Sequence, residues 1–116
     1  MQRYEPADAR FERSPGQDAD IFAANLVDQR DGGPITVGYG RYQPDQVLET
    51  EIVVDDVMVV LEGRVSVEAD GQVFAAGPGE IIYMPKGNSV VIRSHGEGAL
   101  TAYVTYPHWA EAEEGQ

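Results

Sequence analysis

Short apolar runs separated by turn residues fill most of the chain. We expect nine strands, at residues 22–27, 35–42, 47–53, 57–61, 64–69, 72–75, 81–84, 89–93 and 100–106. This spacing is typical of an all-β sandwich or barrel, and no run has a convincing helical period. Strands this short bury enough apolar surface only when a sheet closes or when two sheets face each other. The pattern therefore predicts an all-β fold, a small β-barrel.

Turn residues mark the connections between these strands. Asp70-Gly71 is a two-residue hairpin signal, because both central positions of such a turn need positive φ. Residues 31–34 and 95–98 are rich in glycine and are expected to be loops. The polar first twenty residues are interrupted by proline and glycine, which predicts an irregular arm. We expect an N-terminal arm at 1–20, a barrel domain at 21–109 and an acidic C-terminal tail at 110–116.

Composition excludes several classes of function. The 116 residues suffice for one domain, and 8 Lys plus Arg against 20 Asp plus Glu give a net charge of -12. This charge repels phosphate, so we expect no nucleic acid partner. The longest apolar run is too short to span a membrane and the N-terminus lacks a signal-peptide pattern, which predicts a cytoplasmic protein without membrane contact. The absence of cysteine excludes thiolate chemistry.

The segment GPGEIIYMPKGNSV, residues 77–90, contains part of a known spacing pattern. It fits the second half of the cupin signature, G-x5-P-x-G-x2-H-x3-N, at Gly79, Pro85 and Gly87. The histidine position of that signature is Val90 and the asparagine position is Ser94. Glycine at strand corners and proline at a strand end have structural roles in a barrel.

The first half of the signature can be anchored on Gly63, which follows the run VMVVLE. Asp56 then stands where the signature has its glutamate ligand. Glu51 and Glu49 stand at the two histidine positions when the longer spacer is used. The histidine set of the signature is therefore missing from this chain.

The chain resembles the cupin superfamily and, within it, the Q-type cupins of ethanolamine utilisation. The segments that carry this likeness are VDQRDGGPITVGYG, DDVMVVLEGRVSVEADGQ, AAGPGEIIYMPKGNSV and AYVTYPHW, between residues 27 and 109. The resemblance implies a jelly-roll barrel that is often dimeric. It also implies a link to ethanolamine catabolism and bacterial microcompartments, with an acetate kinase activity attributed to that group.

Glu49 and Glu51 share one face of a strand because they are two residues apart. The resemblance implies that this face is the barrel interior, where Asp56 would join them. Desolvation and mutual repulsion would keep at least one of these carboxyl groups protonated near neutral pH, and such a pair can act as general acid and general base. We take Glu49, Glu51, Asp56 and Tyr103 as candidate catalytic residues.

Two other interpretations of the same acids stay open. Carboxylates suit Mg²⁺, Mn²⁺ or Ca²⁺, so Glu49, Glu51 and Asp56 could hold a weakly bound divalent cation, although no firmly bound cofactor is expected. Alternatively, the strand register differs by one residue, so that Thr50 and Ile52 face inward and the glutamates lie on a solvated surface.

The expected function is small-molecule binding in the barrel. The candidate binding residues are Tyr39, Met58, Val60, Tyr83, Lys86, Val90 and Ile92. We expect an enzyme of the isomerase, cyclase, dehydratase or lyase type, using interior carboxylates and a tyrosine without a firmly bound metal. The alternative is a non-catalytic metabolite-binding or accessory cupin of ethanolamine utilisation. Exposed strand edges also predict a homodimer through the outer face of one sheet.

Overall fold

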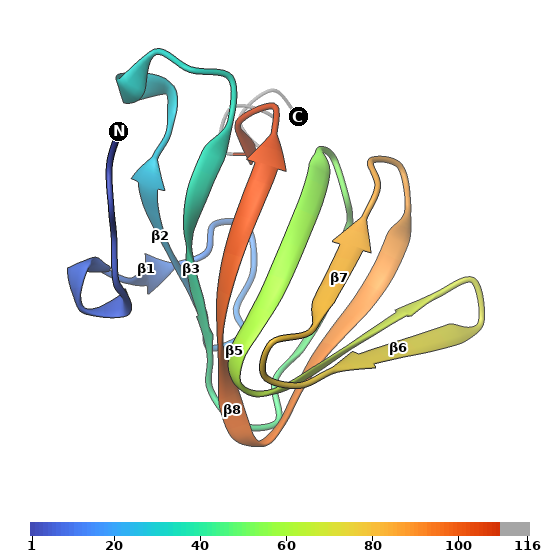
Figure 1. Cartoon of the computed structure of the whole chain (residues 1–116). Helices are drawn as coiled ribbons and strands as arrows, with labels where there is room; N and C mark the ends of the chain where they lie inside the picture. The colour runs from blue at the N-terminus through green and yellow to red at the C-terminus, as the bar shows by residue number, and fades with distance from the viewer. Residues whose placement is uncertain (110–116) are drawn as a thin grey trace.

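The computed structural model of the protein describes residues 1–109. Its elements are η1 (Pro6–Asp8), β1 (Glu12–Arg13), β2 (Ile21–Val27), η2 (Gln29–Asp31), β3 (Thr36–Tyr42), β4 (Val47–Glu51), β5 (Asp55–Ala69), β6 (Gln72–Ala76), β7 (Ile81–Met84) and β8 (Ser89–Tyr106). The predicted all-β class is therefore confirmed (Figure 1). The predicted acidic tail, 110–116, lies outside the described residues.

All strand pairs of this part of the chain are antiparallel. Hydrogen bonds join the strands in the order β1-β2-β3-β8-β5-β6, while β4 pairs with β8 and β7 pairs with β5. The end strands of this order do not pair with each other, so the sheet is not closed by hydrogen bonds. It folds over on itself instead, and its two halves enclose one apolar interior.

The two longest strands, β5 and β8, belong to both halves of the folded sheet. Residues 56–59 of β5 pair with β7 and residues 65–69 pair with β6. Likewise, residues 89–93 of β8 pair with β4 and residues 99–105 pair with β3. Figure 1 shows β5 and β8 bending together at the lower end of the view.

Two glycines make this bend possible. Gly63 and Gly98 have φ angles of 76° and 70°, and a Cβ built on Gly63 would lie 2.0 Å from the Gly98 carbonyl oxygen. Only a glycine fits such a close approach with positive φ. The register between β5 and β8 shifts on both sides of Gly63, as at a β-bulge.

The predicted loop at residues 95–98 is wrong for this reason. Those residues lie within β8, because the glycine bend lets the strand turn the corner while its pairing with β5 resumes on the other side. The predicted separation of residues 57–61 from 64–69 is wrong in the same way, since both runs belong to β5. The hairpin at Asp70-Gly71 is confirmed, with φ angles of 51° and 77°.

The N-terminal arm lies against the outer face of β2 and β3. The Arg13 guanidinium donates to the Asp20 carboxylate and stacks over the Phe22 ring at 5.2 Å. Arg41 of β3 stacks in turn over the Phe11 ring of the arm, at 5.0 Å. These contacts fix the segment that follows, residues 14–17, beside the interior of the folded sheet.

An apolar cluster fills the interior near the bend. Its buried members are Ile52, Met58, Val60, Val65, Val67, Ala76, Ile82, Met84, Val90, Ile92 and Ala99. Val60 and Val65 are completely shielded from solvent. Both halves of the sheet contribute side chains, so this cluster is what holds the halves together.

Candidate functional site

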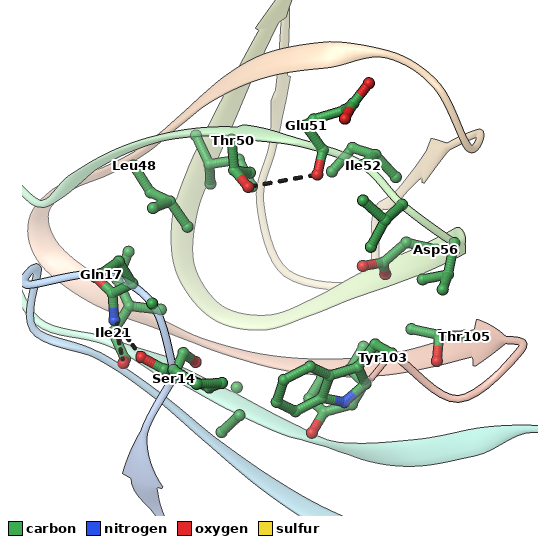
Figure 2. Close-up of a pocket in the computed structure, with 18 of the residues that line it drawn as sticks. Ser14, Gln17, Ile21, Leu48, Thr50, Glu51, Ile52, Asp56, Tyr103 and Thr105 are labelled. Atoms are coloured by element: carbon green, nitrogen blue, oxygen red, sulfur yellow. Dashed lines mark hydrogen bonds between the residues drawn. The ribbon is translucent and has the colours of Figure 1, made fainter. Parts of the chain in front are cut away.

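A cavity of about 240 Å³ opens at the end of the interior away from the bend, beside the first residues of β5. Its wall includes side chains of β3, β4, β5 and β8 and the arm segment 14–17, and Figure 2 shows many of them. The residues that matter for its chemistry are Tyr42, Thr50, Ile52, Asp56, Tyr103 and Trp109. A site of this size suits a molecule of few atoms.

Asp56 is the interior carboxyl group of this cavity. It lies two and four residues before the buried Met58 and Val60 on β5, so alternation along the strand directs all three side chains inward. Its register partners, Met84 of β7 and Thr105 of β8, are buried as well. Asp56 is therefore a polar residue on an otherwise buried strand face.

The environment of Asp56 makes its protonation unusual. Its Oδ1 atom is buried and has no hydrogen-bond partner among the described residues. Burial raises the pKa of Asp56 to about 6, because desolvation disfavours the charged form. Near neutral pH this carboxyl group is mostly ionised and a minority is protonated. Such a group can exchange a proton with a bound molecule.

Tyr103 is held in place by hydrogen bonds on the same side of the cavity. Its hydroxyl group donates to Asn25 Oδ1, and the Trp109 indole N–H donates to the same oxygen at 2.9 Å. A Cβ at Gly38 would lie 2.6 Å from the Tyr103 hydroxyl, so glycine there leaves room for the ring. Burial raises the pKa of Tyr103, and the phenol stays neutral.

Tyr42 supplies a second phenol to the wall. Burial raises its pKa, and the neighbouring Asp56 carboxylate raises it further. Sequence reasoning missed Tyr42, although it shares a strand face with Gly38 and Gly40 of β3. Two glycines on that face signal that β3 makes room for other side chains, which could have pointed to a cavity.

The interior position predicted for Glu49 and Glu51 is wrong. Both are exposed, whereas Ile52 is buried and Thr50 is partly buried. The reason is the strand register, which pairs Thr50 with the buried Val90. Figure 2 shows the Glu51 carboxylate turned away from Asp56. The alternative register, with Thr50 and Ile52 facing inward, is confirmed.

The divalent-cation site considered for Glu49, Glu51 and Asp56 is not assembled, because both glutamates are exposed on β4 whereas Asp56 shares the inward face of β5 with Met58 and Val60. Within residues 1–109, no group of three or more His, Asp or Glu side chains is arranged to hold a metal ion. Val90, at the histidine position of the cupin signature, is buried in the apolar cluster. The residues of this site do not fit the metal of the signature.

The two histidines have partners elsewhere. His108 is buried, and its Nε2 donates to the Gly33 carbonyl at 2.9 Å. Its Nδ1 therefore accepts from the Thr36 hydroxyl, at 2.8 Å. The His95 Nε2 atom is 2.7 Å from the Ser66 hydroxyl. Neither lines the cavity.

The predicted apolar binding residues lie mostly in the core. Ile92 lines the cavity. Met58, Val60 and Val90 are buried in the cluster beneath it and serve packing.

The predicted polar binding residues lie outside the cavity. Tyr83 is 60% exposed, because Ile82 and Met84 take the inward positions of β7. Lys86 is exposed and donates its backbone N–H to the Asp55 carboxylate. Tyr39 contacts the arm, with its hydroxyl 3.4 Å from the Tyr4 carbonyl. The prediction that these three side chains line the pocket is wrong. Tyr83 and Tyr39 occupy outward-facing positions of their strands, and Lys86 lies in a turn.

The antiparallel sheet folded around a small interior cavity defines the class of this protein, the cupins. The family model for the ethanolamine utilisation protein EutQ matches residues 7–111. The chain belongs to the EutQ family.

Solved structures resemble the fold over most of the chain. A protein of unknown function from Rhizobium leguminosarum is 57% identical, with a TM-score of 0.78 over 93% of this chain and 98% of that one. The putative ethanolamine utilisation protein EutQ of Salmonella typhimurium is 23% identical, with a TM-score of 0.79 over 90% of this chain and 84% of that one. The polyketide cyclase RemF of Streptomyces resistomycificus is 20% identical, with a TM-score of 0.78 over 91% of this chain and 79% of that one. No curated protein matches this chain. No helix among residues 1–109 is long and apolar enough to cross a membrane.

Proposed function

We propose that the protein binds a small organic molecule in the cavity and that Asp56 transfers a proton to or from it. The observation that carries the proposal is the buried Asp56 Oδ1 atom, which has no hydrogen-bond partner among the described residues and lines an open cavity. Buried polar groups are normally paired, and an orphan carboxyl oxygen at a cavity marks a place for a ligand. The reaction is of the isomerase, cyclase, dehydratase or lyase type and requires no firmly bound metal.

Asp56 acts as the general base in this proposal. Its pKa of about 6 leaves it mostly ionised near neutral pH while keeping it basic enough to accept a proton. The neutral phenol of Tyr42 is the nearby candidate for stabilising negative charge on the substrate. Tyr103 acts as a positioning and binding group, because its hydroxyl proton is already used in the bond to Asn25. RemF, a polyketide cyclase, is an example of chemistry carried by this fold.

Hydrogen exchange at carbon tests the proposal without knowledge of the natural substrate. The protein is incubated in D₂O with hydroxyacetone, dihydroxyacetone and aminoacetone, and loss of the α-proton signals is followed by NMR. We expect exchange above the buffer rate for at least one probe. Asp56→Asn should reduce that exchange about a hundredfold or more, because the base is lost.

Glu62→Gln is the matched control for that experiment. It removes one carboxylate on the same strand, but its side chain is exposed and Glu62 is not among the residues that line the cavity. We expect its exchange rate to equal that of the unmodified protein. If the probes bind without any exchange, or if Asp56→Asn exchanges them equally fast, then Asp56 is not a base.

A non-catalytic metabolite-binding protein of ethanolamine utilisation is the second candidate, favoured by the EutQ family match over residues 7–111. Binding of the probes without exchange is the result that would support it. We do not extend to this chain the acetate kinase activity attributed to Q-type cupins. Among the described residues, those lining the cavity include Glu49, Glu51 and Asp56 but no Lys, Arg or His to hold acetate or phosphate.

We further propose that the protein is a homodimer through the outer face of β7, β5 and β8. Exposed or partly buried apolar side chains cross this face in register: Ile81 and Tyr83 on β7, Val57 and Val59 on β5, and Val104 on β8. A continuous apolar face of this kind is unusual on a monomer. Because the chain carries a net charge of -12, its polar surfaces repel a second copy, which favours association through an apolar face.

Light scattering tests the dimer. We expect a dimeric mass at micromolar concentration, and a monomeric mass for Ile81→Glu, because Ile81 is 64% exposed and its replacement leaves the interior untouched. Val47→Glu on β4, which is 53% exposed away from this face, is the control and should stay dimeric. A monodisperse monomer of the unmodified protein would refute the assignment.

A further inference from the structure

The arm contributes a second unsatisfied oxygen to the cavity. Among residues 1–109, the buried side-chain polar atoms without a hydrogen-bond partner are Asp56 Oδ1 and Gln17 Oε1, and both residues line the cavity. The Gln17 amide nitrogen donates to the carbonyls of Ser14 and Ile21, at 3.0 and 3.4 Å. These bonds orient the amide so that its oxygen is the free end. Both unsatisfied atoms are acceptors when Asp56 is ionised.

The hydroxyl groups on the wall also have acceptor capacity left. The Tyr103 hydroxyl donates its proton to Asn25 Oδ1, and the Thr105 hydroxyl donates its proton to the Pro107 carbonyl at 3.0 Å. The Thr50 hydroxyl donates to the Glu51 carbonyl at 3.4 Å, a bond drawn in Figure 2. A hydroxyl has only one proton, so each of these groups offers lone pairs to a ligand. The cavity is therefore rich in acceptors.

The charges and aromatic rings of the cavity wall indicate which ligands it can bind. The cavity wall of the described chain contains no Lys, Arg or His, so an anionic ligand would find no counter-charge. Tyr42, Tyr103 and Trp109 all belong to the wall, and aromatic faces attract cations that lie within about 6 Å. The Asp56 carboxylate, several further acceptors and the aromatic rings of one small cavity match the needs of an organic ammonium group.

We propose that the ligand of this cavity is a small organic cation, a primary ammonium whose N–H groups bind Asp56 Oδ1 and the acceptors around it. The inference rests on the proposed ligand binding in this cavity and specifies the class of ligand. The cavity volume of about 240 Å³ restricts the ligand to a compact molecule such as an amino alcohol.

Binding of such a cation depends on the ionisation of Asp56. The titratable groups that face Asp56 are Tyr42 on β3 and Tyr103 on β8, and burial raises the pKa of both, so neither ionises near neutral pH. The register partner of Asp56 on β7, Met84, does not titrate. The other carboxylates of the cavity wall, Glu49 and Glu51 on β4, are exposed to solvent. Ammonium binding should therefore weaken as the pH falls through about 6, where Asp56 takes up its proton. A bound cation should lower the pKa of Asp56 in return.

Three molecules of matched size and different charge test the proposal. They are 3-amino-1-propanol, 1,3-propanediol and 3-hydroxypropionate, titrated at pH 7.5 into the full chain. The protein has one tryptophan, so the indole N–H resonance of Trp109 is a unique reporter at the cavity wall. We expect 3-amino-1-propanol to bind about tenfold or more tightly than the diol, and 3-hydroxypropionate to bind weakest.

Two variants connect this preference to Asp56. Asp56→Asn should reduce the affinity for 3-amino-1-propanol to that for the diol and remove its pH dependence between pH 5 and 7.5. Glu62→Gln, an exposed carboxylate on the same strand, makes the same charge change and should alter neither. Two results with the folded, unmodified protein would overturn the assignment. One is binding of the diol or 3-hydroxypropionate at least as tight as binding of 3-amino-1-propanol. The other is a Trp109 resonance that does not shift when 3-amino-1-propanol is added. Exchange of hydroxyacetone would still support proton transfer, so failure of the two proposals can be told apart.

Discussion

The two ends of β5 lie in different environments inside one folded sheet. Near the bend, Val60, Val65 and Val67 are almost completely shielded and pack with Val90. At the other end, the same inward-facing alternation places Asp56 against an open cavity. One strand thus carries both fully buried valines and a carboxyl group whose charged form is disfavoured by burial.

This difference shows how the fold tolerates an unsatisfied carboxyl group. An ionised carboxylate without partners destabilises a folded protein, whereas buried valines stabilise it. The cluster at the bend can offset the cost of Asp56 because both ends belong to one continuous pair of strands, β5 and β8. Val90 adds to this stabilising cluster. It stands at the histidine position of the cupin signature, and its side chain is buried among the apolar residues near the bend.

Removing the bend should have the largest effect. Gly63→Ala would bring a Cβ to 2.0 Å from the Gly98 carbonyl at a φ of 76°, and we expect it to lower the free energy of unfolding by about 3 kcal/mol or more. Gly79→Ala is the matched control, because it also has positive φ, 85°, but no atom within 4 Å of the new Cβ. It should cost about 1 kcal/mol, from backbone strain alone. Urea unfolding of both variants measures the difference, and equal costs would contradict the role given to the bend.

Asp56→Asn should stabilise the protein near neutral pH. The pKa of Asp56 rises from 3.8 to about 6 on folding, so between these values the folded state binds more protons than the unfolded state. The contribution of Asp56 therefore becomes less favourable as the pH rises through this window. We expect the variant to be more stable by roughly 1 to 3 kcal/mol at pH 7.5 and to lose most of that advantage at pH 4. Urea unfolding at both pH values measures it, and a gain at pH 4 equal to that at pH 7.5 would contradict the raised pKa.

Tyr103→Phe should have a smaller effect. The change removes the hydrogen bond to Asn25 but leaves Asn25 Oδ1 with its bond from Trp109, so we expect a cost of about 1 kcal/mol and a shift of the Trp109 indole resonance. Tyr39→Phe is the control on the outer side, where the hydroxyl makes only a 3.4 Å contact with the arm. Thermal unfolding and NMR should detect almost no change for it. Equal effects of the two substitutions would show that Tyr103 is not specially held.

The sequence predicted the class of fold and part of the cavity wall. Strand alternation and turn residues were enough for the β-sheet and the Asp70-Gly71 hairpin, because both follow from local backbone preferences. Asp56 and Tyr103 were also selected, and both line the cavity. Tyr42, Gln17 and Asn25 were missed, since each reaches the site only through pairing between strands or through the path of the arm.

The sequence by itself determined that this chain forms an all-β fold of the cupin class, because the period of its apolar residues, its turn glycines and its motif spacing are local properties. Tertiary structure alone decided which acid faces inward. Glu49, Glu51 and Asp56 are all acidic residues near one end of the sheet, and a shift of one residue in strand pairing exchanges inside for outside. The pairing of Thr50 with Val90 turned both glutamates to the solvent. The pairing of Asp56 with Thr105 left its carboxyl group in the cavity, because neighbours across a sheet share a face.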